Sequence, residues 1–111
     1  MKIEKRKKND VLILDLHGKI LIGEGIEELR ETINNAIKDK ETKLLLNFAD
    51  VPYLDSTGLG EVVRSYTSIK KADGVVKIVN LTNHVRDLLS VTKLITVFDT
   101  FEDEAKAIAS F

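Results

Sequence analysis

Apolar and polar positions along this chain follow two different periods, and the first part of the pattern predicts a pair of strands. Residues 2–8 and 11–16 have the composition of strands, and Asn9 and Asp10 between them form a polar pair suited to a tight turn. The second segment is mostly apolar. We therefore expect a hairpin whose second strand lies inside a sheet.

The middle of the chain predicts helices that alternate with buried strands. Apolar side chains recur at helical spacing within residues 25–38 and again within residues 56–71. Residues 43–48 and 75–79 are short, nearly continuous apolar runs, which are typical of parallel strands covered on both faces. This order of elements indicates crossover units of strand, helix and strand.

The last third of the chain continues the alternation. Thr82 is suited to cap a short third helix, residues 95–98 predict a further strand, and residues 102–109 predict a terminal helix. Strands that alternate with helices predict an α/β fold with a mostly parallel sheet, right-handed crossovers, an N-terminal hairpin strand and about four helices. We expect residues 1–111 to form a single domain.

A polar hexapeptide, DSTGLG at residues 55–60, lies between a predicted strand and a predicted helix. Ser56 can serve as the N-cap of that helix and Asp55 could do the same, so capping alone accounts for either residue. Capping does not account for Gly58 and Gly60, because a glycine costs about 1 kcal/mol relative to alanine inside a helix. Bare backbone suits the close approach of another molecule, or a tight contact inside the fold. An outward-pointing Gly60 would favour the first interpretation.

The periodicity after the hexapeptide also separates two faces of the predicted helix. Apolar side chains gather on one face, and the opposite face carries Thr57, Glu61, Arg64 and Ser68, with Gly60 at its edge. In parallel sheets, ligand and reaction sites gather at the carboxyl ends of strands, where Ser56 would lie. The pattern therefore places the hexapeptide at the functional edge of the predicted sheet.

Several classes of enzyme lack their motifs in this chain. There is no GxxxxGK[ST] phosphate loop, Ser56 is not part of a GxSxG elbow, and residues 23–25 (GEG) are better explained as a turn than as a dinucleotide loop. His17 and His84 lie far apart without paired metal-ligand spacing. An aspartate-phosphorylated receiver domain would need acidic Mg²⁺ ligands after an early strand, where residues 16–19 (LHGK) stand. We expect neither catalysis nor a metal site.

Composition limits the partners and the compartment. With 17 basic and 18 acidic residues the formal net charge is −1, which gives no footprint for direct binding of nucleic acid or membranes. A local basic cluster in the first predicted strand could form a patch for an acidic partner, but it is better explained by an edge strand that discourages pairing between sheets: Lys2, Lys5, Arg6, Lys7 and Lys8. Without cysteine, and without an apolar run of about 20 residues, we expect a cytoplasmic protein.

The hexapeptide belongs to a longer segment, LNFADVPYLDSTGLG at residues 46–60, which resembles the motif of the anti-sigma factor antagonist family, the STAS domain. Supporting segments are LDLHG at residues 14–18, KIVNL at residues 77–81, and VRDLL at residues 85–89, which leads to Val97-Phe98. The resemblance covers nearly the whole chain and includes the order of the elements.

The resemblance implies a bacterial partner switch. In this family the unphosphorylated antagonist binds an anti-sigma factor that is also a serine kinase, which liberates a sigma factor for transcription. The implied phosphoacceptor is Ser56, with Thr57 as the alternative hydroxyl, and a metal-dependent serine phosphatase reverses the modification. ATP and Mg²⁺ belong to the partner kinase, so no cofactor is expected in this chain. The implied partner surface is formed by Asp55, Ser56, Thr57, Gly58, Gly60, Glu61 and Arg64.

Two positions depart from the family pattern, and a second function stays open. Leu21 stands where many antagonists have an aspartate after Gly18, and Asn47 replaces a frequent aspartate before the motif. The alternative function is that of a structural STAS subunit in a stress-sensing scaffold, or of an accessory protein of a lipid transporter. A native mass measurement would separate the two, because a large homo-assembly favours the scaffold and a monomer or homodimer favours the soluble antagonist.

Overall fold

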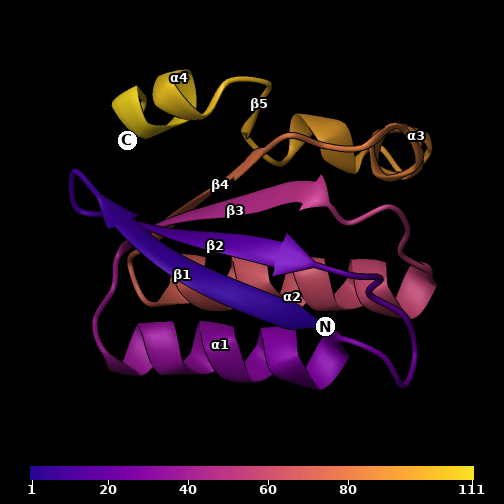
Figure 1. Cartoon of the computed structure of the whole chain (residues 1–111), viewed down its shortest axis with the longest axis horizontal. Coiled ribbons are helices and arrows are strands. Elements are labelled where there is room, and N and C mark those ends of the chain that lie inside the picture. Colours follow the sequence, from indigo (N-terminus) through magenta and orange to yellow (C-terminus); the bar gives the residue numbers. More distant parts are fainter.

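Five strands form one sheet in the order β1-β2-β3-β4-β5 in the computed structural model, which describes residues 1–111 (Figure 1). β1 pairs antiparallel with β2, and every other neighbouring pair is parallel. The predicted α/β fold with a mostly parallel sheet and an N-terminal hairpin strand is therefore confirmed. The strands are β1 (Lys2–Lys8), β2 (Val11–His17), β3 (Lys43–Asp50), β4 (Val75–Val79) and β5 (Thr100–Phe101).

The turn between β1 and β2 has the backbone that a two-residue hairpin requires. Asn9 and Asp10 have φ angles of 52° and 67°, and Lys8 pairs with Val11 directly beside them. Positive φ at both central positions matches the twist of the two strands, and asparagine and aspartate tolerate it better than other residues with side chains. β2 lies between β1 and β3, as the apolar sequence of this strand predicts.

Helices cover both faces of the sheet. They are α1 (Ile26–Lys38), α2 (Ser56–Lys71), α3 (Asn83–Val91) and α4 (Glu104–Ala109). In Figure 1, α1 and α2 lie side by side under one face, while α4 lies on the other side of the sheet. None of these helices combines the length and the apolar character needed to cross a membrane.

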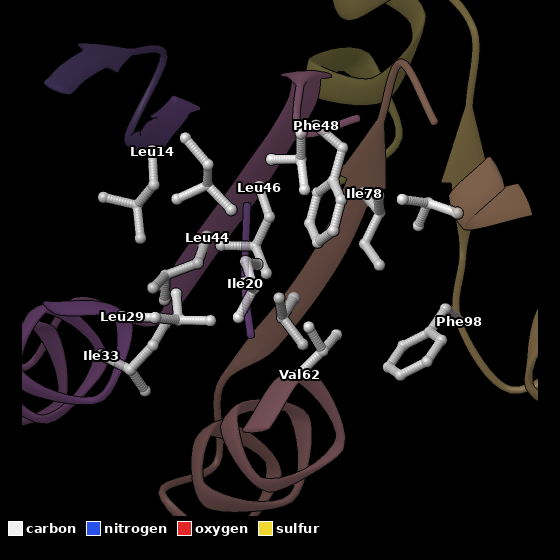
Figure 2. Packing of buried hydrophobic residues seen from close by; sticks show 14 of the residues in the cluster. Leu14, Ile20, Leu29, Ile33, Leu44, Leu46, Phe48, Val62, Ile78 and Phe98 are labelled. Atoms are coloured by element: carbon white, nitrogen blue, oxygen red, sulfur yellow. The ribbon is translucent and has the colours of Figure 1, made fainter. Parts of the chain in front are cut away.

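The larger core lies between the sheet and the pair α1 and α2. Figure 2 shows Leu29 of α1 and Val62 of α2 directed toward Leu44 and Leu46 of β3. The intervening Leu45 points to the other face, where it packs with Ile108 of α4. Because both faces of β3 are buried, its apolar run is continuous rather than alternating.

The prediction of a strand at residues 95–98 is wrong. A 3₁₀ turn, η1, spans Leu94–Thr96, and the last strand, β5, follows at Thr100–Phe101. Phe98 enters the larger core instead, where its ring meets that of Tyr66 edge to face at 5.2 Å. A short apolar run has no periodicity that separates a strand from a packed turn. The terminal helix is shorter than predicted, since it begins at Glu104 behind an Asp103 cap.

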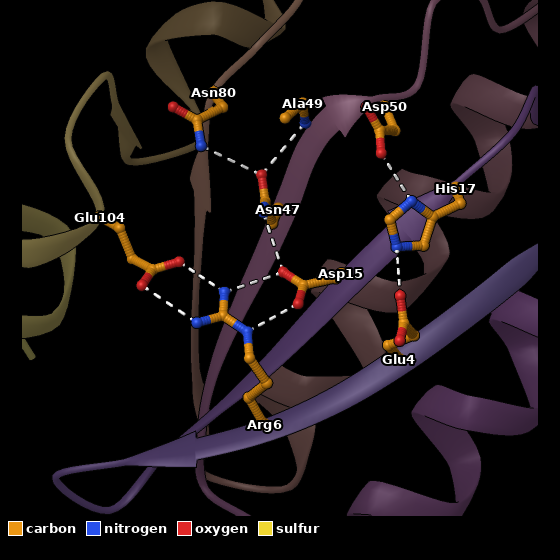
Figure 3. A network of polar contacts seen from close by, with 9 residues as sticks. All are labelled: Glu4, Arg6, Asp15, His17, Asn47, Ala49, Asp50, Asn80 and Glu104. Carbon is orange, nitrogen blue, oxygen red and sulfur yellow. Dashed lines mark hydrogen bonds and ion pairs between the residues drawn. The ribbon is translucent and has the colours of Figure 1, made fainter.

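A polar network on the α4 face ties the hairpin to the end of the chain (Figure 3). The Arg6 guanidinium donates two hydrogen bonds to Asp15 of β2, at 2.6 and 2.9 Å, and two to Glu104 of α4, at 3.2 and 2.6 Å. These bonds hold the pKa of both carboxyl groups below the ordinary value. The side-chain amide of Asn47 donates a hydrogen bond to Asp15 and accepts one from Asn80. Asn47, which replaces a frequent aspartate of the family pattern, therefore makes its contacts within this network.

Replacing Arg6 tests this network. We expect Arg6→Gln to lower the free energy of unfolding at pH 7 by about 1–2 kcal/mol, because Arg6 is partly exposed and solvent weakens its ion pairs. The Asp15 and Glu104 carboxylates have lowered pKa values, so their contribution is complete above their ordinary values of 3.8 and 4.5 and is lost as the pH falls through the lowered ones.

Urea unfolding between pH 7 and pH 2.5 measures this dependence, with Lys5→Gln on the same strand as the control. The difference between wild type and Arg6→Gln should shrink in acid, while the control stays close to wild type at every pH. A difference that does not change with pH would contradict the assignment of the ion pairs.

Candidate functional site

The hexapeptide begins α2, and Asp55 rather than Ser56 is its N-cap. Asp55 has extended backbone angles, and its Oδ1 accepts a hydrogen bond of 2.7 Å from the amide of Gly58. Ser56 is the first residue of the helix. The expected capping role of Ser56 is therefore wrong, and its exposed side chain is not used to close the helix end. The Asp55 carboxyl is the cap that the sequence allowed as an alternative.

The second oxygen of Asp55 holds a different loop. Its Oδ2 accepts a hydrogen bond of 3.0 Å from the amide of Ile22, and the amide of Asp55 donates to the carbonyl of Ile20 at 3.3 Å. Two amides on one carboxylate stabilise its charged form and lower the pKa of Asp55. Asp55 thus joins the loop between β2 and α1 to the start of α2, and we call this set of contacts the Asp55 clasp.

Gly58 completes the clasp from the helix side. A Cβ atom at Gly58 would lie 1.9 Å from the carbonyl oxygen of Ile20, so only glycine allows this approach. Gly58 is buried. The expectation that Gly58 is on an exposed surface is wrong, because this glycine serves the tight internal contact that the sequence left open as an alternative.

Gly60 has the opposite environment. A Cβ built at Gly60 would meet no atom within 4 Å, and Gly60 is exposed together with Ser56 and Thr57. The prediction that Gly60 points outward is therefore confirmed. Two hydroxyl groups and a stretch of bare helix backbone lie next to one another at the surface.

Glu61 is not exposed, which corrects its place on the helical wheel. Only 3% of the residue is accessible, because α1 packs against this side of α2. Its Oε1 accepts hydrogen bonds from Arg30 of α1 at 3.2 and 2.8 Å, and its Oε2 accepts one from Arg64 at 2.7 Å. We call Arg30, Glu61 and Arg64 the arginine–glutamate triad. Arg64 keeps a partly exposed side chain, as the sequence predicts.

Sequence reasoning missed Arg30. It lies 31 residues from Glu61, and no local spacing connects the two. Glu61 raises the pKa of the Arg30 guanidinium by accepting its hydrogen bonds. The only sequence signal was an acidic residue, Glu61, next to the apolar positions Leu59 and Val62, where an unpaired carboxylate would be costly to bury.

A surface pocket of about 380 Å³ lies beside the motif, and the two hydroxyl-bearing residues differ in their relation to it. Thr57 lines this pocket and Ser56 does not. The other lining residues come from the loop after β2 and from the start of α1: Ile22, Gly23, Glu24, Gly25, Ile26, Glu27, Glu28 and Arg30. Gly23 and Gly25 have φ angles of 77° and 86°, which confirms the turn predicted for residues 23–25.

The two histidines make contacts with neighbouring side chains. His17 lies between Asp50, at 2.7 Å, and Glu4, at 2.9 Å (Figure 3). The ring of His84 stacks on Tyr53 with 4.2 Å between ring centroids. Leu21, which stands where the family pattern has an aspartate, is part of a turn, since its amide donates a hydrogen bond to the carbonyl of Glu24 at 2.8 Å. The same short loop is joined to the clasp through Ile22.

Comparison with known proteins identifies the family. The model of the STAS domain matches residues 2–107. The chain belongs to the STAS domain family. A relative, the anti-sigma-B factor antagonist of Bacillus subtilis (strain 168), is 28% identical over 100 residues, which cover 86% of this chain and 84% of that protein. The resemblance drawn from the hexapeptide is thus confirmed.

Solved STAS structures share the fold over nearly the whole chain. An anti-sigma factor antagonist from Mycobacterium paratuberculosis superposes with a TM-score of 0.85 at 19% identity, covering 98% of this chain and 92% of that one. The Bacillus cell fate determinant SpoIIAA in its phosphorylated form gives a TM-score of 0.74 at 20% identity, covering 98% of both chains. At these identities the likeness shows the fold.

The two glycines of this STAS domain predict opposite effects of the same substitution. We expect Gly58→Ala to destabilise the fold by about 3 kcal/mol, because its methyl group meets the Ile20 carbonyl and the backbone must shift. Gly60→Ala should be neutral or stabilising by up to about 1 kcal/mol, because its methyl group meets open space within a helix. Urea unfolding of both variants measures the difference. Equal stability of the two variants would show that the Ile20 contact is not formed.

Proposed function

We propose that this STAS domain is an anti-sigma factor antagonist controlled by phosphorylation of Ser56. The observation that carries the proposal is the environment of Ser56: its side chain is exposed at the first position of α2, beside bare Gly60, and the helix is capped by a different residue. A kinase can modify such a hydroxyl without breaking a contact of the fold.

A phosphate on Ser56 would alter the surface more than the interior. It would add about −1.5 to −2 charges next to Asp55, on a surface that carries two small hydroxyl side chains and a bare glycine. The N-terminus of α2 favours a nearby anion through its dipole and free amides. The Bacillus cell fate determinant SpoIIAA has this fold in its phosphorylated form, which supports a fold that persists with the modification. Partner binding would therefore fail through desolvation, bulk and repulsion of like charges, without unfolding.

The chain's own role in this function is binding. An anti-sigma factor with serine kinase activity binds the unphosphorylated form and supplies ATP and Mg²⁺, and a metal-dependent serine phosphatase restores that form. The relative from B. subtilis, which is named an anti-sigma-B factor antagonist, supports this class of partner. Release of a sigma factor in the cytoplasm is the proposed output.

Phosphosite mapping tests the acceptor. The wild-type chain, Ser56→Ala and Thr57→Val are incubated with the cognate kinase and ATP, and modified residues are identified by mass spectrometry. We expect one phosphate on Ser56 in wild type and in Thr57→Val, and none in Ser56→Ala. Modification elsewhere, with both hydroxyl groups untouched, would refute the assignment of the site.

Binding measurements test the switch. Ser56→Ala should bind the kinase as tightly as wild type, because the hydroxyl of Ser56 holds no contact of the fold. Ser56→Asp should bind at least about tenfold more weakly, since it places a charge in the contact. The control is Ser90→Asp, which adds the same charge on exposed α3. If Ser56→Asp and Ser90→Asp lose the same amount of affinity for the kinase, the effect comes from the net charge of the chain and not from the position of Ser56, which would contradict the proposal.

A further inference from the structure

The arginine–glutamate triad leaves unused positive charge beside the motif. Both oxygens of the buried Glu61 carboxylate are occupied, one by Arg30 and the other by Arg64. A buried carboxylate needs such partners, because burial of an unpaired charge is costly. Two guanidinium groups share one carboxylate, so some of their N–H donors have no acceptor in the triad. The triad as a whole therefore carries an excess positive charge.

The donors that remain are concentrated on Arg64. Its Nε binds Glu61 and its Nη2 is buried without any acceptor in the chain, which leaves Nη1 as the nitrogen that a partner can reach. Arg30 uses both Nε and Nη2 on Glu61, and Glu27 lies near enough to Arg30 to act on its charge. An unpaired buried donor is rare in folded proteins and calls for a physical reason. Arg64 is therefore the less compensated cation of the triad.

Helix geometry places Arg64 on the side of the motif. Ser56, Gly60 and Arg64 follow one another at intervals of four residues, so they lie along one side of α2, over a rise of about 12 Å. Side chains on a helix lean toward its N-terminus, which directs Arg64 over the turn that contains Gly60. Gly60 has no side chain and open space above it, so the side of α2 between Ser56 and Arg64 is open, while 36% of the Arg64 side chain is exposed.

We propose that Arg64 is a docking site for a carboxylate side chain of the anti-sigma factor, and that Glu61 is the positioning residue that fixes the guanidinium. The inference rests on the proposed function and specifies the chemistry of its partner. Charge complementarity selects an acidic group, and a carboxylate oxygen can accept a charge-assisted hydrogen bond from Nη1 while Nε stays on Glu61. A phosphate on Ser56 would place negative charge on the same side of α2 and repel that carboxylate, which makes the site sensitive to phosphorylation.

The matched comparison is between two arginines of equal exposure. Arg64 and Arg86 have 36% and 37% exposed side chains, and Arg86 makes only a long contact of 3.6 Å with Glu102. Calorimetric titration with the kinase that binds the wild-type chain is run from 0.05 to 0.5 M NaCl. We expect Arg64→Gln to raise Kd about tenfold or more at low salt and to flatten the salt dependence. Arg86→Gln should follow wild type in both respects.

The positioning role of Glu61 is tested by the Kd for the kinase and its salt dependence, which a loss of fold stability alone would not change in this pattern. Glu61→Gln removes the charge that holds Arg64 and keeps the shape of the side chain, so we expect a weaker Kd with the wild-type salt slope retained. Arg64→Lys keeps the charge without the planar fork and should recover only part of the affinity. Arg64→Gln alone leaves the buried Glu61 carboxylate with only Arg30 as a partner, which can destabilise the fold. The double variant Glu61→Gln/Arg64→Gln has no such carboxylate, so its Kd reports the loss of the docking site.

A double-mutant cycle with Ser56→Asp tests the link to phosphorylation. If the negative charge acts on the partner's carboxylate at Arg64, Ser56→Asp should weaken binding less in the Arg64→Gln background than in wild type. Additive losses, or an Arg64→Gln variant that binds like Arg86→Gln, would overturn the inference while the proposed function stands. If Ser56→Asp binds the kinase as wild type does, the proposed function fails, and the docking site fails with it.

Discussion

The carboxylate of Asp55 is the interaction on which the arrangement of the motif depends. One oxygen closes the first turn of α2 through Gly58, and the other holds the loop after β2 through Ile22. Because the cap is supplied by Asp55, the neighbouring Ser56 is free of any structural duty. The Asp55 clasp thereby fixes the position of a hydroxyl group without using it, and this is why the proposed phosphorylation would change a surface and leave the fold in place.

The same helix turn separates internal and external roles residue by residue. Gly58 allows the backbone of Ile20 to approach, whereas Gly60 keeps the outer surface bare. Glu61, one residue later, is buried against α1 and binds an arginine on each side. The motif is therefore packed and hydrogen-bonded on the side that faces α1 and the loop after β2, and exposed at Ser56, Thr57 and Gly60 on the other.

Local sequence patterns predicted the sheet, the main helices and the outward face of Gly60, because these follow from periodicity and turn preferences. They could not choose between Asp55 and Ser56 as the cap, since both are good caps and the choice depends on Ile22, which is 33 residues away. They predicted an exposed Glu61, because a helical wheel shows only the residues of α2 and not the neighbouring helix α1 that buries this side chain. They also missed the 3₁₀ turn at Leu94–Thr96, where the packing of Phe98 overrides a short apolar run.

The most direct test is amide hydrogen exchange, together with chemical shifts, of the chain before and after phosphorylation of Ser56. The Asp55 clasp should survive, so the amides of Ile22 and Gly58 should stay protected in both forms, with shift changes confined to the start of α2 and the adjoining loop. Loss of protection at Ile22, accompanied by shift changes throughout the core between the sheet and α1, would show that phosphorylation acts by opening the fold and would contradict this account.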